Sequence, residues 1–189
     1  MCFSTPFDEE SVDKLESLNV PCYKIASFEC TDLPLIKKVS KTNKPVIIST
    51  GMATLDEIHE AVDCARSNGC KNLAILKCVS IYPANHNDLN LSSIKYLKKK
   101  FNCEVGFSDH TLGIGASVAA VALGANIIEK HFTLSKKNSG LDSQFSSDPH
   151  ELSLLVSEAN KAKEAIGKVF FGPTKLEKKG RLRRRSIYC

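Results

Sequence analysis

A short run of apolar, β-forming residues followed by an amphipathic helix recurs along this chain, at a spacing of roughly 20–30 residues. The predicted strand and helix pairs are 2–7 with 8–19, 22–29 with 31–41, 45–51 with 54–69, 73–83 with 89–100, 103–109 with 113–123, and 125–133 with 149–166. Helix signals support the division: Thr54 with Glu57 forms a capping box, and Thr31 or Asp32 can cap another helix. Alternation of this kind predicts parallel strands joined by helical crossovers.

Two architectures fit this alternation, an open doubly wound sheet and a closed (β/α)8 barrel. The G-x-G-x-x-G turn is missing after the first predicted strand, which weakens the dinucleotide-binding form of the open sheet. Polar residues stand where nearly every predicted strand stops, and in a barrel those ends form one active-site face. We therefore predict a TIM barrel that is incomplete here, with about six strand–helix units and the first two missing.

Composition narrows the class of protein. The 189 residues fit one domain, and no apolar run approaches the roughly 18–20 residues that cross a bilayer. The start, "MCFSTPF", does not resemble a signal peptide, and the eight cysteines form no CxxC pair. We expect reduced thiols, no zinc cluster, a cytoplasmic location and no membrane partner.

The net charge of +5 is concentrated in "KLEKKGRLRRR" at 175–185. Clustered arginines can neutralise nucleic-acid phosphates, but no aromatic residues are interleaved and no reader fold is recognisable. We therefore predict no nucleic-acid partner, a partial barrel domain over 1–172 and a basic linker over 173–189.

Lys24 stands inside "CYKIAS", a predicted parallel strand that should be buried and apolar. Its amine could be solvated at the barrel rim, or it could face the barrel mouth and bind an anion. In the second case, hydroxyls at neighbouring strand ends would add the neutral donors that a phosphate or carboxylate needs. These hydroxyls belong to Thr5, Ser27, Ser49 and Ser108.

Two histidines, His110 in "GFSDHT" and His131 in "IIEKHFT", close successive predicted strands. Each could be structural, but a pair on neighbouring strands with Glu29 and Asp109 near is as well suited to hold Mn, Fe or Zn. Because side chains alternate along a strand, Ser108 and His110 should face one way and Asp109 the other. Asp109 is therefore expected to be a structural or supporting group.

The segment "SKKNSGLDSQFSSDP" at 135–149 is the longest without periodicity. It could be a plain polar surface loop, or it could carry substrate contacts as loops after barrel strands often do. In the second case Asp142 would accept hydrogen bonds from sugar hydroxyls.

Several strings, taken in order, resemble the sialic acid synthase family, the phosphoenolpyruvate-dependent nonulosonate synthases. They are "STPFDEESVDKLESLNVPCYKIAS" (4–27), "KPVIISTGMATLDEI" (44–58), "SIYPA" (80–84), "GFSDHTLGI" (106–114), "AAVALGANIIEKHFTL" (119–134) and "RRRSIY" (183–188). The family's catalytic domain is a (β/α)8 barrel. The resemblance implies that the missing parts are its first two strands and a small C-terminal antifreeze-like domain beyond the linker.

The resemblance also implies a reaction, in which phosphoenolpyruvate condenses with an N-acetylated amino sugar to give a nine-carbon 2-keto acid and phosphate. It implies that Thr5, Lys24, Ser27, Ser49 and Ser108 grip phosphoenolpyruvate, that Glu29 is an acid/base or water-positioning group, and that Tyr82 and Asp142 contact the sugar. His110 and His131 would hold a divalent metal, typically manganese, that polarises the sugar aldehyde and helps to place the attacking water. A full-length form would be a homodimer.

Two positions narrow the implied sugar. Sialic acid synthases often have Asn in place of Ser80, a further expected sugar contact, and "G-P-D-H" in place of "GLDSQFS" at 140–146. The latter string resembles pseudaminic acid synthases, whose sugar is a 6-deoxy-2,4-diacetamido hexose, and we predict that type. N-acetylneuraminate or legionaminate synthesis, and an inactive barrel fragment with only a binding role, are the alternatives.

Overall fold

Helices and strands alternate in the computed structural model, which describes residues 2–137 and 140–184. The elements are α1 (Glu9–Ser17), β1 (Tyr23–Ile25), α2 (Leu33–Ser40), β2 (Val46–Ser49), α3 (Leu55–Ser67), β3 (Leu73–Cys78), α4 (Ser93–Phe101), β4 (Glu104–Asp109), α5 (Gly115–Ala122), β5 (Ile127–Lys130) and α6 (Pro149–Ile166). Short 3-10 helices occur at Ser27–Glu29, His86–Asp88 and Glu177–Arg183. No helix among these residues is long and apolar enough to cross a membrane.

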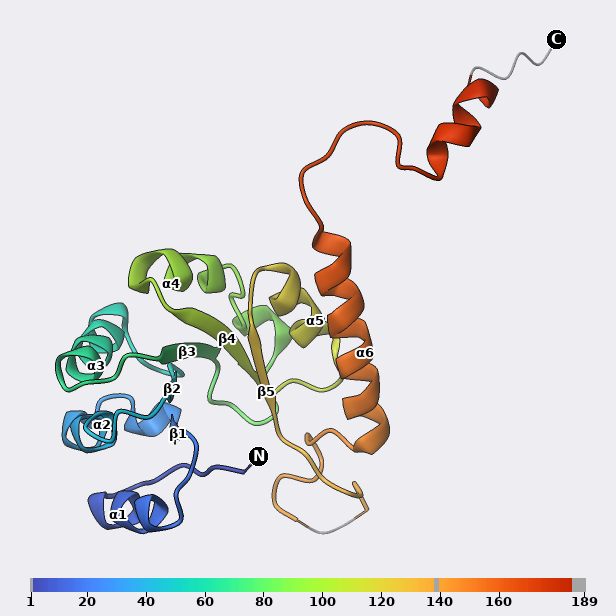
Figure 1. The fold of residues 1–189 in the computed structure, drawn as a ribbon. Coiled ribbons are helices and arrows are strands. Elements are labelled where there is room, and N and C mark those ends of the chain that lie inside the picture. Colours follow the sequence, from blue (N-terminus) through green and yellow to red (C-terminus); the bar gives the residue numbers. More distant parts are fainter. Residues whose placement is uncertain (1, 138–139, 185–189) are drawn as a thin grey trace.

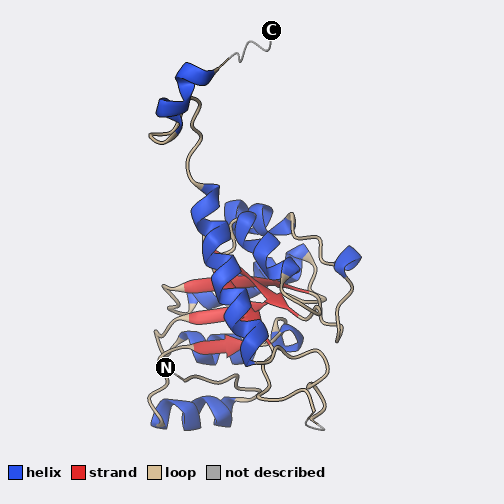
Figure 2. Ribbon diagram, turned by 90° about the vertical axis from the view of Figure 1, so that its right-hand side faces the viewer, coloured by secondary structure: helices blue, strands red, loops and turns tan. Residues whose placement is uncertain are grey.

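The strands form one parallel sheet in the order β1-β2-β3-β4-β5, with helices α2 to α6 around its outside (Figure 1). Figure 2 shows α6 lying across the strands. The sheet curls, because Lys24 Nζ on β1 lies 3.7 Å from Glu129 Oε2 on β5. A flat sheet would hold the first and fifth strands roughly 19 Å apart, beyond the reach of these two side chains. A curled parallel sheet with helices outside is part of a barrel, so the predicted incomplete TIM barrel is confirmed.

Strand register sorts the side chains onto two faces. Ile25, Ile48 and Ile75 lie side by side on three strands and are fully buried beneath the helices. Lys24 and Ile47, one position earlier on their strands, belong to the opposite, inner face. The hydrophobic core therefore lies between strands and helices, while the inner face is free to carry polar groups.

The helix starts follow the local sequence signals. Asp32, rather than Thr31, caps α2 by accepting a hydrogen bond from the backbone N–H of Leu35. Thr54 and Glu57 form both hydrogen bonds of the predicted capping box at α3. These caps satisfy backbone donors that the first helical turn leaves free.

The strand predicted over residues 2–7 is wrong, since this segment has no regular structure and joins no described strand. Its neighbour would be β1, which has only three residues. Pro6 also lacks the N–H that a ladder requires. The described chain therefore has five strands rather than six.

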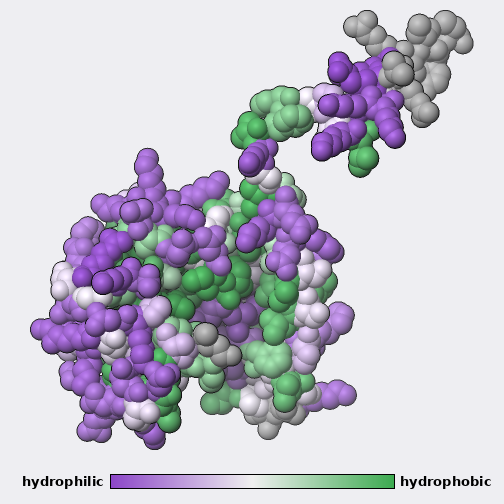
Figure 3. Space-filling model, in the orientation of Figure 1, coloured by the Kyte–Doolittle hydropathy of each residue, from purple (hydrophilic) through white to green (hydrophobic). Residues whose placement is uncertain are grey.

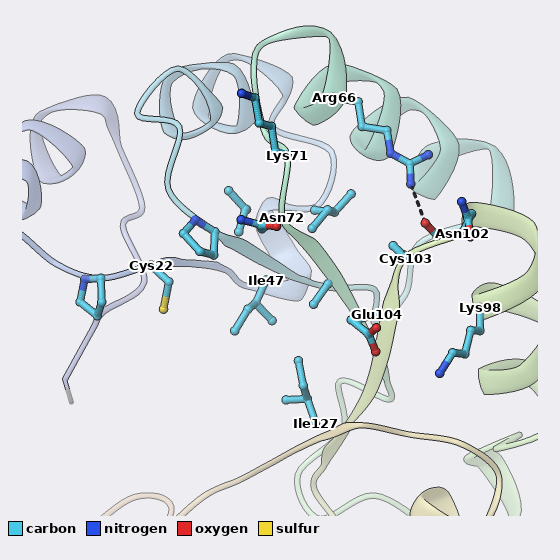
Figure 4. A pocket seen from close by; sticks show the side chains of 15 residues that line it. Cys22, Ile47, Arg66, Lys71, Asn72, Lys98, Asn102, Cys103, Glu104 and Ile127 are labelled. Carbon is cyan, nitrogen blue, oxygen red and sulfur yellow. Dashed lines mark hydrogen bonds between the residues drawn. The ribbon is translucent and has the colours of Figure 1, made fainter.

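A cavity of about 720 Å³ opens at the amino ends of the strands (Figure 4). Ile47 and Ile127 lie at its floor, and Arg66, Lys71 and Lys98 lie around it. In the same region, hydrophobic residues gather in the middle of one face of the molecule, over the strands (Figure 3). This cavity lies at the opposite end of the sheet from the two histidines, so it is not where the predicted chemistry converges.

We expect Gly106→Ala to lower the free energy of unfolding in urea by about 2 kcal/mol, because the new methyl group overpacks the inner face. Its Cβ would lie 2.7 Å from the Cβ of Ile127 and closer still to the Ile127 carbonyl oxygen. Gly115→Ala is the matched control: no atom lies within 4 Å of its added Cβ, and we expect a gain of about 0.5 kcal/mol. Equal stability of the two variants would contradict this packing.

Candidate functional site

Polar side chains converge on the inner face of the sheet at the carboxyl ends of the strands. The register aligns Cys78, Ser108 and Glu129 across β3, β4 and β5. Cys78 and Ser108 each lie two residues after an inner-face residue, Leu76 or Gly106, so they share the inner face. Ser108 Oγ donates a hydrogen bond to Glu129 Oε1 at 2.7 Å. His110 and His131 come two residues after Ser108 and Glu129, directly past the ends of β4 and β5, so alternation turns them to the same face.

Lys24 brings a buried positive charge into this group. The side chain is only 8% exposed, and its Nζ lies 3.7 Å from Glu129 Oε2. Burial lowers the pKa of Lys24, while the Glu129 carboxylate partly offsets that effect. A cation held here beside hydroxyl groups is suited to bind a phosphate or a carboxylate.

The hydroxyl of Ser49 is buried and has no hydrogen-bond partner among the residues that the structure describes. Ser49 ends β2 on the inner face, in register with Leu76. Buried polar atoms nearly always find a partner, and one that lacks a partner in a free protein calls for an explanation. A ligand oxygen would provide that partner.

Gly51 allows three strand ends to come together beside this hydroxyl. Its N–H donates a hydrogen bond to Ser27 Oγ at 3.0 Å. A Cβ added to Gly51 would lie 2.8 Å from Ser27 Oγ and would collide with Ser80 Oγ. The absence of a side chain at position 51 therefore leaves the serine hydroxyls facing one small space.

The two histidine rings lie in edge contact, with centroids 5.2 Å apart and planes at 73°. His110 Nδ1 lies 2.8 Å from the carbonyl oxygen of Val79, and His131 Nδ1 lies 3.3 Å from Asp142 Oδ2. An acceptor at Nδ1 fixes the proton there and leaves Nε2 with a free electron pair, as in histidines that bind metals.

The charge state of the histidines is set by their surroundings. Burial lowers the pKa of His131, and charge on His110 lowers it further. Burial also lowers the pKa of His110, but hydrogen bonds with Cys78 and Val79 outweigh this and raise it above its ordinary value. Neutral His131 is a ready ligand, whereas a metal would displace a proton from His110.

The two imidazoles fit part of the ligand set of a divalent metal. Among the residues that the structure describes, no three His, Cys, Asp or Glu side chains converge as a complete cage. Two imidazoles alone leave coordination positions open for water and substrate oxygens, as catalytic sites require.

An aromatic wall borders the histidines. Tyr82 stacks on His110 with ring centroids 4.2 Å apart, and Phe145 lies 5.1 Å from the His131 ring. Tyr82 and Phe145 are themselves 5.5 Å apart. The loop after β5 therefore reaches the site through Asp142 and Phe145, which supports the substrate-contact interpretation of this loop; residues 138–139 lie outside the described part.

Asp109 faces the other way, as alternation predicts. Its carboxylate accepts hydrogen bonds from Ser117 Oγ on α5 and from the backbone N–H of Thr111, and it pairs with Lys130. A Ser–Asp–His triad within "SDH" is therefore excluded.

The other predicted site residues, Glu29, Thr5 and Ser80, have fewer recorded contacts with the groups described above. Glu29 ends the 3-10 helix after β1, and its Oε2 is buried without a hydrogen-bond partner. Thr5 lies in the irregular segment before α1 and takes part in no hydrogen bond within the described part of the chain. Ser80 lies beside Cys78, with Oγ and Sγ 3.8 Å apart.

Three residues in the site were given no role from the sequence. Glu129 is one of the polar residues at the end of a predicted strand. It stands two residues before His131, so side-chain alternation places both on the same face, and this signal could have identified it. Cys78 resembles an ordinary buried thiol, yet its Sγ lies 3.9 Å from His110 Nδ1. Phe145 lies in a loop without periodicity, and only the folded chain brings it to His131.

Comparison with known proteins assigns the family. The model of the NeuB family matches residues 1–170. The chain belongs to the NeuB family. The predicted membership in the sialic acid synthase family is thereby confirmed.

Several relatives of this NeuB-family chain are named as legionaminic acid or pseudaminic acid synthases. It is 48% identical to the N,N'-diacetyllegionaminic acid synthase of Campylobacter jejuni, over 93% of this chain and 53% of the relative. It is 42% identical to the pseudaminic acid synthase of the same organism, over 100% of this chain and 55% of the relative. The crystal structure of an N-acetylneuraminic acid synthetase from Leptospira borgpetersenii superposes with a TM-score of 0.87 at 36% identity, covering 97% of this chain and 64% of that one. The chain thus spans about half the length of the curated relatives it matches.

Protein stability can be used to test whether the Ser49 hydroxyl lacks a partner. We expect Ser49→Ala to leave the free energy of unfolding unchanged or to raise it by up to about 1 kcal/mol, because it removes a buried polar atom without a partner. The matched control is Ser40→Ala, which removes a buried hydroxyl that donates to the Ile36 carbonyl at 2.7 Å and should cost about 1 kcal/mol. Urea unfolding without ligands measures both. A larger loss at position 49 than at position 40 would show that Ser49 has a structural partner.

Proposed function

We propose that the protein is a metal-dependent synthase that joins phosphoenolpyruvate to an N-acetylated amino sugar. C3 of phosphoenolpyruvate forms a bond to the aldehyde carbon of the sugar, the aldehyde oxygen takes up a proton, and water adds at C2. Loss of phosphate from C2 leaves a nine-carbon 2-keto acid. The observation that carries this proposal is the convergence of two Nδ1-anchored histidines, buried Lys24 and the unpartnered Ser49 hydroxyl on one face.

Lys24 and the serine hydroxyls are the groups for phosphoenolpyruvate. Lys24 pairs with the carboxylate of Glu129 at 3.7 Å. A bound phosphate or carboxylate would compete with Glu129 for that ammonium group and would also accept hydrogen bonds from Ser49 and Ser108. Ser27 extends the same site, and Thr5 is proposed to join it from the segment before α1.

His110 and His131 are the proposed ligands of a divalent metal, with manganese the expected ion. When bound, such an ion supplies positive charge to the aldehyde oxygen, where negative charge develops as the carbon–carbon bond forms. The chain's own part is to hold Nδ1 of each ring at an acceptor, so that Nε2 of each ring would be the ligand atom once His110 has lost its extra proton. Glu29, whose Oε2 is buried and unpartnered, is the proposed acid/base or water-positioning group.

The sugar is proposed to lie against Tyr82, Asp142 and Ser80, near Phe145. An apolar ring beside polar acceptors suits a sugar that carries an extra acetamido group and lacks a hydroxyl. The string "GLDSQFS" favours a pseudaminic acid precursor. The higher overall identity to a legionaminic acid synthase favours that precursor as the second candidate.

The remaining proposals concern the whole protein. Residues 1–172 are proposed as the partial barrel and 173–189 as a basic linker, of which 185–189 lie outside the described residues. Leu176 in the linker is exposed, and so are Val169, Phe170 and Phe171 at the end of the proposed barrel segment. A homodimer in the cytoplasm is the proposed state of the full-length enzyme.

Phosphate release tests the function directly. With the full-length protein, we expect phosphate from phosphoenolpyruvate only when an acetamido sugar and Mn²⁺ are both present. The 2,4-diacetamido sugars should be consumed faster than N-acetylmannosamine. Undiminished turnover after chelation of the metal would exclude the two-histidine metal site.

Matched lysine variants test the anion site. Lys24→Met should raise KM for phosphoenolpyruvate by at least about 10-fold, since a charge-assisted hydrogen bond of 1.5–3 kcal/mol is lost. Lys77→Met removes a partly buried lysine of β3 whose hydrogen bond, among the described residues, goes to the carbonyl of the next residue, Cys78, and it should leave KM unchanged. Equal effects of the two variants would contradict the role of Lys24.

A further inference from the structure

The ladder between β4 and β5 ends in two register pairs directly before the two histidines. Ser108 and Glu129 face inward and are joined by a hydrogen bond of 2.7 Å. Asp109 and Lys130, next in register, face outward with Oδ2 and Nζ 3.2 Å apart. Each of these charged residues directly precedes one of the histidines in the sequence.

We propose that the Asp109–Lys130 ion pair is a positioning device that sets the separation and direction of the His110 and His131 rings. The inference rests on the proposed function, in which the two histidines bind a metal. Neither Asp109 nor Lys130 would touch the metal or the substrate, because both side chains lie on the opposite face of the strands.

The ion pair is buried, and each of its members makes further hydrogen bonds. The side chains of Lys130 and Asp109 are 3% and 0% exposed. Asp109 Oδ1 accepts hydrogen bonds from the N–H and the hydroxyl of Thr111, and its Oδ2 accepts one from Ser117 Oγ. Lys130 Nζ also donates to the Thr111 carbonyl oxygen at 2.7 Å. The pair therefore connects β4, β5, the loop after β4 and helix α5.

Stability alone does not account for such a pair. Two buried charges contribute little net stability compared with two well-packed apolar residues, because both must be removed from water. The position of the pair does account for it. The strands end at Asp109 and Lys130, so this pair is the last register contact of the ladder before the two histidines.

The register also explains why a small shift at the pair would matter. A metal accepts two imidazoles only when both Nε2 atoms point to one centre. The ring centroids are 5.2 Å apart, and each ring is carried by the residue next to a member of the pair. Loosening the ion pair would let the two strand ends move independently, which spreads the histidines over many separations.

Direct Mn²⁺ binding to the full-length protein, without phosphoenolpyruvate or sugar, tests the proposal by electron paramagnetic resonance of the free ion. We expect Asp109→Asn and Lys130→Met each to weaken Mn²⁺ affinity by about 10- to 100-fold, the usual effect of losing a group that supports a metal ligand. Lys130→Arg keeps the charge and should keep most of the affinity. Lys77→Met is the control, since it removes a lysine from the outer face of β3 that pairs with no carboxylate in the described part of the chain.

The double variant Asp109→Asn/Lys130→Met separates positioning from stability. It leaves no uncompensated buried charge, so unfolding in urea should be closer to that of the unsubstituted protein than in either single variant. Its Mn²⁺ affinity should nevertheless remain about 10-fold or more below normal. Should a single variant fail to fold, the double variant and Lys130→Arg decide the question.

The outcomes are distinct. Normal Mn²⁺ affinity in the folded double variant would show a purely structural pair and would overturn this inference while leaving the metal site intact. Failure of the unsubstituted protein to bind Mn²⁺, or binding that survives His110→Ala, would overturn the metal site of the proposed function and this inference with it. Reduced affinity in the double variant with normal affinity in Lys77→Met is the expected result.

Discussion

The site depends on one constraint: the pairing register of β4 with β5, together with the alternation of side chains along each strand. The register fixes Ser108 opposite Glu129 and Asp109 opposite Lys130, so that His110 and His131 must follow on the inner face. The same parity puts Lys24 on that face, and the curl of the sheet brings it to Glu129. A shift of one residue in the register would turn the histidines into the helix layer and bring the Asp109–Lys130 pair to the barrel mouth.

Much of this fold could be predicted from the sequence because its signals are local. Caps such as Thr54, and the alternation of strands with amphipathic helices, depend on neighbours within a few residues. The segment 2–7 has strand-like composition, but a strand needs a partner, and composition does not say whether one is available. Inner-face polarity at Lys24, Ser49 and His110 could also be found, since a polar residue in a buried parallel strand requires a reason.

The rest of the site depends on contacts between residues far apart in the chain. Glu129 joins Ser108 and Lys24 only because the sheet curls, and Phe145 reaches His131 only because its loop folds back. The unpartnered hydroxyl of Ser49 could not be anticipated either, because a serine in a sequence carries no sign of what surrounds it. A cavity of about 720 Å³ opens at the amino ends of the strands, but the groups with unsatisfied or anchored polar atoms lie at the carboxyl ends.

Anomalous X-ray diffraction at the manganese absorption edge tests the central claim most directly. The measurement uses crystals of the full-length protein grown with Mn²⁺ and phosphoenolpyruvate. The account predicts one strong peak within coordination distance of Nε2 of both His110 and His131, with the phosphate or carboxylate of phosphoenolpyruvate against Lys24 and Ser49. A manganese peak bound to other side chains, or no peak at these histidines, would contradict it.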